Sequence, residues 1–441
     1  MVLTDYNKKL RYLDKIPQFL PGTGISRAEK MLDKAGTRYD GFKIIHVAGS
    51  NGKGSTCAYL ESILRSNGYK TGLFTSPHLA DIRERIRIDG NIISEELFER
   101  CFDYIYDIET KLAQDNVRLA YFDYLLGIAL EAFRAEKADY VILETGLGGR
   151  FDATNAVKGK VLSVIATISL EHTAILGDSL KKIAFEKSGI IAKKVPVVYL
   201  DSSKEASEVI KKIADDNQAE MYPVKDKDIA VDKIDKNHID FSLHNGYHKD
   251  NCYKIATCAV YQTKNCALAL CSAKVLEKQG LISLSEKDTK TAVWQAFWPG
   301  RMEQLSDRIY VDGAHNPEGI KAFIQTLQTV FNGSGHTLLF SVVNDKAFEP
   351  MIRQLCESGL FDRYVVTQIQ GDRLLAGKYI QDIFKKYTDN PVYEYEDLED
   401  AFVSAVKLSH DNDGDLFCAG SLYLTGDIKK IMQKKKGFTD K

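Results

Sequence analysis

The chain has 441 residues, of which 44% are hydrophobic, and this length predicts two or three domains. It carries 59 Lys+Arg and 61 Asp+Glu, and the formal net charge of −2 argues against nucleic-acid binding through a basic surface field but leaves a local anion site open. No signal-peptide pattern opens the chain, its apolar runs are too short to cross a bilayer, and its 8 scattered cysteines indicate reduced thiols. We therefore expect a cytoplasmic protein with no nucleic-acid or membrane partner.

Strands and helices alternate through the first part of the chain. Residues 42–48 predict a buried strand, followed by a glycine-rich turn at 49–54 and a helix over 55–67. Further elements are predicted as strands at 69–75, 138–144, 161–168 and 195–200 and as helices at 124–135 and 261–278. This alternation predicts a mostly parallel sheet. Residues 219–252 instead show short alternating stretches that are typical of hairpin strands.

A domain boundary is predicted at 294–301, which holds both tryptophans and a Pro-Gly breaker. The alternation then restarts, with strands at 308–311, 337–343, 363–368, 391–395 and 416–419 and helices at 317–331, 374–387 and 398–408. We therefore expect an α/β protein of two domains, 1–296 and 297–441, the first built on a P-loop-type parallel sheet and the second Rossmann-like.

The turn Gly49-Ser50-Asn51-Gly52-Lys53-Gly54 lies between a buried strand and a helix start. Backbone N–H groups in such a turn point at one spot, the helix N-terminus adds partial positive charge, and Lys53 adds a full charge. The strict phosphate-loop pattern is not met, because Val47 occupies its first glycine position and Gly54 follows the lysine. The alternatives are a phosphate cradle and a glycine-rich turn without a ligand.

Polar residues follow two later strands. Glu144 ends a buried strand, where a carboxylate can reach a magnesium ion at the phosphates or cap the next turn. A glycine-dense loop at 145–155 follows it and is either a ligand-facing loop or a flexible one. His172 comes after another strand and becomes a candidate ligand if that strand neighbours Glu144, although magnesium usually prefers oxygen.

Charged residues in two further segments, 312–317 and 81–88, are candidates for a functional role. Asn316 and Pro317 fit an N-cap and a first helical turn, but this leaves Asp312 and His315 at a strand end unexplained. Residues 81–88 alternate charged and apolar side chains, which is typical of a solvated strand or of arginines that meet an anionic ligand.

Taken in order, these motifs resemble the bifunctional dihydrofolate synthase/folylpolyglutamate synthase enzymes, which are relatives of the Mur ligases. The similarity runs from about residue 20 to residue 430. It rests on eight segments: HVAGSNGKGS at 46–55, SPHL at 76–79, ERI at 84–86, ETGLGGRFDATN at 144–155, EKSGII at 186–191, WPGRME at 298–303, DGAHNP at 312–317 and GSLYL at 420–424.

The resemblance implies a nucleotide site and a metal site. ATP would be held by Gly49, Asn51, Gly52, Lys53, Gly54, Ser55, Thr56, Asn265, Arg301 and Asp312. Magnesium, at two sites, would be held by Ser76, Glu144 and His172. Lys187 matches the lysine that these enzymes carbamylate, which would turn a cation into an oxygen ligand.

The resemblance also implies a reaction in which L-glutamate is ligated to dihydropteroate, to folates or to both through an acyl phosphate. It further implies that the enzyme is a monomer. The catalytic set would be Lys53, Lys187, Asp312 and His315. The substrate set would be Phe122, Asp123, Arg85, Asp152, His315 and Ser421, with Phe122 and Asp123 at the position of a Phe-Glu pair near the pterin pocket. In domain terms, 1–296 would bind ATP and folate, and 297–441 would be the glutamate ligase domain.

The chain departs from the family pattern at Ser50, Asp123, Glu171 and Ser188, where Thr, Glu, Asp and Ala are usual. A Mur-type ligase with another carboxylate acceptor is therefore the alternative. The segment 21–27 resembles the opening of the folate group, and we expect no separate domain for a UDP-sugar precursor. A nucleotide switch without ligation would leave Asp312, His315 and Lys187 unexplained.

Overall fold

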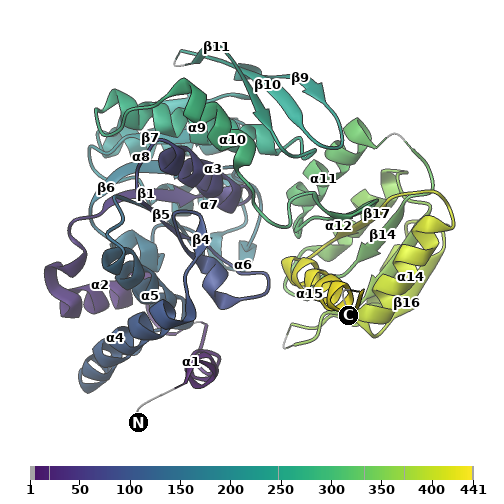
Figure 1. Cartoon of the computed structure of the whole chain (residues 1–441), viewed down its shortest axis with the longest axis horizontal. Coiled ribbons are helices and arrows are strands. Elements are labelled where there is room, and N and C mark those ends of the chain that lie inside the picture. Colours follow the sequence, from purple (N-terminus) through teal and green to yellow (C-terminus); the bar gives the residue numbers. More distant parts are fainter. Residues whose placement is uncertain (1–4, 19, 247, 332, 372, 440–441) are drawn as a thin grey trace. The chain divides into compact units, whose positions relative to one another are not determined.

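The computed structural model describes residues 5–18, 20–246, 248–331, 333–371 and 373–439, and it divides into two compact units (Figure 1). The first unit comprises Met1–Ala230, Phe241–Lys254 and Lys264–Phe297, and the second comprises Val231–Asp240, Ile255–Thr263 and Trp298–Lys441. None of the helices in the described ranges is long and apolar enough to cross a membrane.

The first unit is built on an eight-stranded sheet in the order β4-β3-β2-β5-β1-β6-β7-β8. Its centre is β1 (Lys43–Ala48), which pairs in parallel with β5 (Tyr140–Glu144) on one side and β6 (Lys160–Ile165) on the other. The other strands are β2 (Thr71–Phe74), β3 (Ile86–Ile88), β4 (Asn91–Ile92), β7 (Val197–Leu200) and β8 (Met221–Val224). The pairs β2–β3 and β3–β4 are antiparallel, so that β3 runs against the direction of the other strands. A three-stranded sheet has the order β11 (His248–Ile255), β10 (Ile239–Asn245), β9 (Ile229–Ile234).

Two apolar clusters cover one face of this sheet. In the first cluster, Ile44 and Val141 pack against helices α2 (Gly24–Ala35), α4 (Glu95–Gln114) and α5 (Tyr121–Ala135). In the second, Ala48 and Val197 pack against α7 (Leu180–Ser188) and α8 (Lys204–Asp216). Helices α3 (Lys53–Ser66), α9 (Gln262–Lys278) and α10 (Glu286–Gln295) gather together in Figure 1. The remaining helices are α1 (Tyr6–Leu13), α6 (Thr173–Leu176) and the short 3-10 helices η1 (Gly36–Tyr39), η2 (Ile82–Arg85), η3 (Ala153–Ala156) and η4 (Asp226–Asp228).

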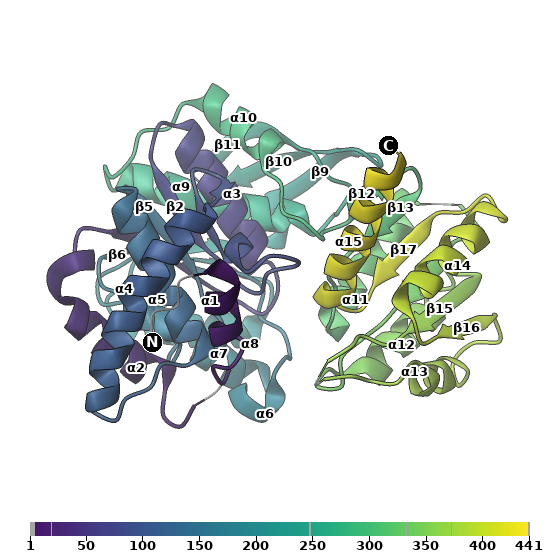
Figure 2. The same cartoon turned by 60° about the horizontal axis from the view of Figure 1, so that its bottom comes forward.

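The second unit holds a six-stranded sheet that is parallel except for its first strand (Figure 2). The order is β12 (Glu303–Ser306), β13 (Ile309–Val311), β17 (Leu416–Ala419), β14 (Thr337–Phe340), β15 (Arg363–Thr367), β16 (Val392–Tyr395). Apolar residues of α11 (Pro317–Val330), α12 (Phe348–Glu357) and α13 (Gly377–Phe384) pack in one cluster, and those of α14 (Leu398–His410) and α15 (Leu422–Thr439) pack in another. Alternate residues of the same strands enter these two clusters, which places the helices on opposite faces.

The predicted α/β class is confirmed, and the prediction was wrong in two segments. Residues 221–224 are not part of a hairpin: α8 provides a crossover, and they join the main sheet as the parallel strand β8. Within the segment 81–88, residues 82–85 form η2 because Asp81 and Glu84 close a capping box there, and residues 86–88 form the strand β3. Helix α5 also starts three residues earlier than predicted, since Asp123 accepts a hydrogen bond from the Ala120 amide at 3.0 Å.

Candidate active site

The turn between β1 and α3 forms the centre of the candidate site. Gly52 is the N-cap residue of α3, with φ of 85°, a conformation that favours glycine. Having no side chain, it cannot cap the helix, whose first amides therefore carry the positive end of the helix dipole. An anion such as a phosphate fits this arrangement.

Two neighbouring residues lie so close to this turn that only glycine fits at positions 49 and 52. A Cβ on Gly49 would lie 2.8 Å from the Cβ of Ala166, just beyond β6. A Cβ on Gly52 would collide with Oδ1 of Asn265, which α9 brings against the turn. The contact supports the predicted grouping of Asn265 with the turn, although its role toward a nucleotide stays a prediction.

Hydrogen bonds join the turn to the segment that follows β6. The amide of Ser50 donates to the Thr167 carbonyl at 2.7 Å. The Ser50 hydroxyl donates to the Ser169 carbonyl at 2.9 Å and accepts from the Ser169 amide at 3.0 Å. Asn51 Nδ2 donates to Ser169 Oγ at 3.4 Å. The turn is thus held in one shape from two sides.

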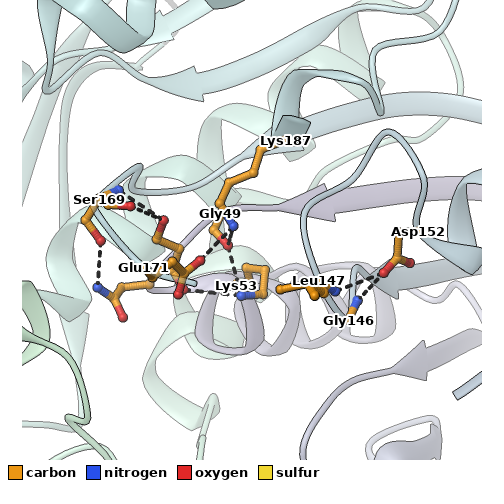
Figure 3. Close-up of polar contacts among 10 residues, drawn as sticks. Gly49, Lys53, Gly146, Leu147, Asp152, Ser169, Glu171 and Lys187 are labelled. Atoms are coloured by element: carbon orange, nitrogen blue, oxygen red, sulfur yellow. Dashed lines mark hydrogen bonds and ion pairs between the residues drawn. The ribbon is translucent and has the colours of Figure 1, made fainter. Parts of the chain in front are cut away.

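Two lysines converge on one carbonyl of the turn (Figure 3). Lys53 Nζ donates to the carbonyl oxygens of Gly49 at 2.9 Å and Ser50 at 3.2 Å. Lys187 Nζ, from α7, donates to the same Gly49 oxygen at 2.8 Å and pairs with Glu171 Oε1 at 2.7 Å. The sequence predicted both lysines as site residues, and the structure brings them together across 134 positions of the chain.

The Lys187–Glu171 ion pair is buried, and the pKa values of both side chains are shifted from their ordinary values. Lys187 is 1% exposed, and burial lowers its pKa to about 8 against the attraction of Glu171. Burial alone would raise the pKa of Glu171, but the charges of Lys187 and Lys53 outweigh it and lower this pKa to about 2. Both groups are therefore charged at neutral pH, and Lys187 is the one that loses its charge under mild conditions.

The predicted metal ligands lie on both sides of the turn. Glu144 is 3% exposed at the end of β5, and its Oε2 accepts the Ser76 amide at 3.1 Å. His172 precedes α6 with φ of 46°. The premise that Glu144 and His172 follow neighbouring strands was wrong, because β1 lies between β5 and β6. In the described residues no three His, Cys, Asp or Glu side chains are grouped to hold a metal.

Asp152 organises the glycine-dense loop after β5. Its Oδ2 accepts the amides of Gly146 and Leu147, each at 2.9 Å, and its Oδ1 accepts the Thr154 amide at 3.0 Å and the Thr154 hydroxyl at 2.5 Å. These four bonds use the lone-pair positions of the carboxylate. Asp152 therefore holds both ends of the loop. A Cβ on Gly146 would collide with the ring of Phe122.

Asp123 and Arg85 have partners that the sequence did not reveal. Arg27 Nε donates to Asp123 Oδ2 at 2.5 Å, and the Arg27 guanidinium also reaches the carbonyls of Leu20 and Pro21. Arg85 Nε donates to His78 Nδ1 at 2.8 Å. Arg27 ends the segment 21–27 that resembles the folate group, and this was the only sequence signal for it.

In the second unit, Asp312 is the most heavily hydrogen-bonded candidate. It follows β13, is 2% exposed, and accepts the Tyr261 hydroxyl at 2.5 Å and the amides of Met302 at 2.9 Å and Ala314 at 2.8 Å. Burial raises the pKa of Asp312, and the charge of Arg301 opposes this. Tyr261 had not been singled out, since nothing in its local sequence indicates a partner 51 positions away.

The other predicted residues of this unit lie at the same end of the sheet. His315 Nδ1 bonds the Gly313 carbonyl at 2.7 Å, and Arg301 Nη1 donates to the Gly300 carbonyl at 2.8 Å. Ser421 follows β17, the strand next to β13, and its hydroxyl accepts the Tyr423 amide at 3.1 Å. Because parallel strands end at one edge, Asp312 and Ser421 share that edge.

Comparison with known proteins shows what the chain is similar to. Residues 300–421 match the family model described as Mur ligase, glutamate ligase domain. The chain is 30% identical over 422 residues to the dihydrofolate synthase/folylpolyglutamate synthase of Bacillus subtilis, covering 93% of this chain and 95% of that protein. It is 28% identical to the dihydrofolate synthetase of Saccharomyces cerevisiae, covering 92% and 97%.

Solved structures extend the similarity to the whole fold. Folylpolyglutamate synthase from Thermotoga maritima superposes with a TM-score of 0.82 at 30% identity, covering 98% of this chain and 97% of that one. Escherichia coli FolC in complex with DHPP and ADP gives a TM-score of 0.84 at 25% identity, with 98% and 99% covered.

The fold, the phosphate-binding type of turn and these comparisons define an ATP-dependent ligase of two α/β units. The chain belongs to the dihydrofolate synthase/folylpolyglutamate synthase family, as the motifs predicted.

Proposed function

We propose that this enzyme uses ATP to join L-glutamate to a carboxylate of dihydropteroate, of reduced folates or of both. The observation that carries the proposal is the convergence of Lys53 and Lys187 on the Gly49 carbonyl at the N-terminus of α3. The Lys53 ammonium group beside a helix N-terminus suits a triphosphate and the charge that moves during phosphoryl transfer, and Lys187 lies next to it. The B. subtilis relative carries both activities in its name.

In this proposal the nucleotide is held by residues of the turn and by three others. Lys53 and the turn around it, with Gly49, Asn51, Gly52, Gly54, Ser55 and Thr56, would bind the phosphates. Asn265, Arg301 and Asp312 would contact the rest of the nucleotide. Residues 1–296 would form the ATP- and folate-binding domain and 297–441 the glutamate ligase domain.

The donor set around Glu144 fits magnesium in part. A buried carboxylate and the Ser76 hydroxyl are oxygen ligands of the kind that magnesium takes, whereas the imidazole of His172 is an unusual one. We propose these three residues as the ligands. When bound, magnesium would neutralise charge that develops on the transferred phosphoryl group.

A carbamate on Lys187 is the second part of the metal proposal. Carbamylation needs the neutral amine, which attacks CO2 and loses a proton. With a pKa of about 8, about a tenth of Lys187 is neutral at pH 7, against about one in 3000 for an ordinary lysine. The carbamate would add oxygen ligands next to Glu171. Carbon-13 bicarbonate should give a carbamate NMR signal in the wild type that Lys187→Met lacks.

The reaction follows from the weak electrophilicity of a carboxylate. The γ-phosphoryl group passes from ATP to an acceptor carboxylate oxygen, giving an acyl phosphate and ADP. The glutamate amine attacks the acyl carbon, the bond to the phosphate oxygen breaks, and the nitrogen loses a proton, leaving an amide and phosphate. Holding amine and acyl phosphate together supplies much of the rate.

The remaining predicted residues would place the two organic substrates. Phe122, Asp123 and Arg85 would surround the acceptor, together with the loop that Asp152 organises. His315 and Ser421 would place glutamate. We further propose that the enzyme works as a monomer in the cytoplasm and needs neither nucleic acid nor membrane.

Phosphate release by the purified protein tests the proposal. ATP, magnesium and glutamate are supplied, and dihydropteroate and tetrahydrofolate are offered separately. Release with both acceptors supports the bifunctional reaction, and release with tetrahydrofolate alone supports a polyglutamate extender. Release with neither, while ATP still binds, would refute the folate assignment and favour a ligase for another carboxylate.

A further inference from the structure

His46 is a buried polar residue in the middle of β1. Its neighbours on the same side of the strand, Ile44 and Ala48, belong to the two apolar clusters of that face, and His46 is 0% exposed between them. Its Nε2 lies 2.8 Å from the Thr154 hydroxyl, 108 positions away. Its Nδ1 is buried with no hydrogen-bond partner in the described structure.

The direction of the bonds follows from the proton count. The Thr154 hydroxyl donates its single proton to Asp152 Oδ1 at 2.5 Å, so it can only accept from His46. His46 therefore carries its proton on Nε2, and Nδ1 remains bare. Burial, and then the nearby charge of Lys160, lower the pKa of His46, which keeps this ring neutral.

Stability does not explain this histidine. A buried acceptor without a partner costs about 1–3 kcal/mol, and an apolar side chain would continue the surrounding clusters without that cost. The histidine therefore serves the hydrogen bond from Nε2 to the Thr154 hydroxyl, and the unpartnered Nδ1 is the cost of that bond.

The bonds beyond Thr154 lead to the glycine-dense loop. One oxygen of Asp152 accepts the amides of Gly146 and Leu147 (Figure 3). The other oxygen accepts the Thr154 hydroxyl and amide. One carboxylate thus ties the two ends of the loop together, and His46 ties that carboxylate to β1. The same strand ends at Ala48, and Gly49, three residues after His46, begins the phosphate-binding turn.

We propose that His46 is a positioning residue: through Thr154 and Asp152 it holds the 145–155 loop, and with it the acceptor substrate, in register with the nucleotide turn. This inference rests on the proposed function, because the loop is assigned to the acceptor there. The loss of this positioning would therefore weaken binding of the acceptor substrate and leave binding of ATP unchanged.

Two amide variants of His46 provide the test. Gln places its side-chain nitrogen the same number of bonds from Cβ as Nε2, whereas Asn reaches only the position of Nδ1. His46→Gln should behave as wild type. His46→Asn should raise KM for the acceptor about tenfold, the effect of one hydrogen bond, with ADP affinity unchanged. Thr154→Ser and Thr154→Val form a second matched pair with the same expected contrast.

Amide hydrogen exchange without acceptor gives a readout that does not depend on activity. Gly146, Leu147 and Thr154 should exchange faster in His46→Asn than in His46→Gln, at equal melting temperature. Equal behaviour of the Gln and Asn variants, or faster exchange without a change in acceptor KM, would overturn the proposal. If His46→Asn does not fold, the Thr154 pair decides by the same two readouts. A wild type that ligates no folate would refute the proposed function, while the exchange comparison would still decide whether His46 holds the loop.

Discussion

The buried pair of Lys187 and Glu171 predicts how the stability of the enzyme changes with pH. The perturbation is the double variant Lys187→Met with Glu171→Gln, which removes both charges and keeps the side-chain lengths similar. Below pH 8 the folded wild type carries a buried ammonium group that burial disfavours. Above pH 8 the folded chain releases this proton, while the unfolded chain still holds it up to about 10.5. The free energy of unfolding must therefore rise with pH in this window.

The magnitude follows from the two pKa values. The interval between the ordinary 10.5 and about 8, at about 1.4 kcal/mol per unit, corresponds to about 3 kcal/mol. About 2 kcal/mol of this gain should be present by pH 9.5. The conversion needs no discount for solvent, because the Lys187 side chain is 2% exposed.

The assay is urea unfolding of wild type and double variant from pH 7 to 9.5 in CO2-free buffer, which keeps Lys187 unmodified. Other lysines contribute equally to both proteins, so the difference between the two isolates the pair. Lys182→Met is the matched control, because Lys182 lies on the same helix but its side chain is 63% exposed. It should leave the rise with pH intact.

A wild-type minus double-variant difference that stays constant between pH 7 and 9.5 would refute the reasoning. It would mean that Lys187 titrates like an exposed lysine, and the carbamylation proposal would lose its physical basis with it.

Three further changes test the candidate site. Lys53→Ala should lower the rate of phosphate release about 100-fold at unchanged melting temperature, because its ammonium group stabilises the negative charge of the transferred phosphoryl group. Near-normal turnover would contradict this. Gly52→Ala should abolish calorimetric ADP binding, since its Cβ would strike Asn265, whereas Gly68→Ala, at a similar φ of 87° but in open space, should retain it. Asp123→Asn should lower the urea-derived stability by about 3 kcal/mol by leaving the Arg27 guanidinium without its charge partner, and a loss below about 0.5 kcal/mol would show that the pair is dispensable.

Local sequence predicted the framework of the site because its signals are short-range. The run from Lys43 to Ala48, the glycines after it and the helix at Lys53 follow from apolar burial and turn chemistry within 25 residues. The same holds for Asp312 at the end of a strand and for Asn316 as an N-cap, whose Oδ1 accepts the Gly319 amide at 2.7 Å. The motif order gave the family, which the comparisons confirm.

The tertiary structure decided which side chains meet. Lys187 reaches the carbonyl of Gly49 across 138 positions, and His46 reaches Thr154 across 108. The sequence-based premise about Glu144 and His172 failed on strand order, since β1 lies between their strands. Strand order and crossovers depend on how apolar faces pack over the whole unit, and no local periodicity encodes them. The sequence by itself therefore determined the elements, the motifs and the family, whereas only the packed sheet decided the partners of each charged group and hence the pKa of Lys187.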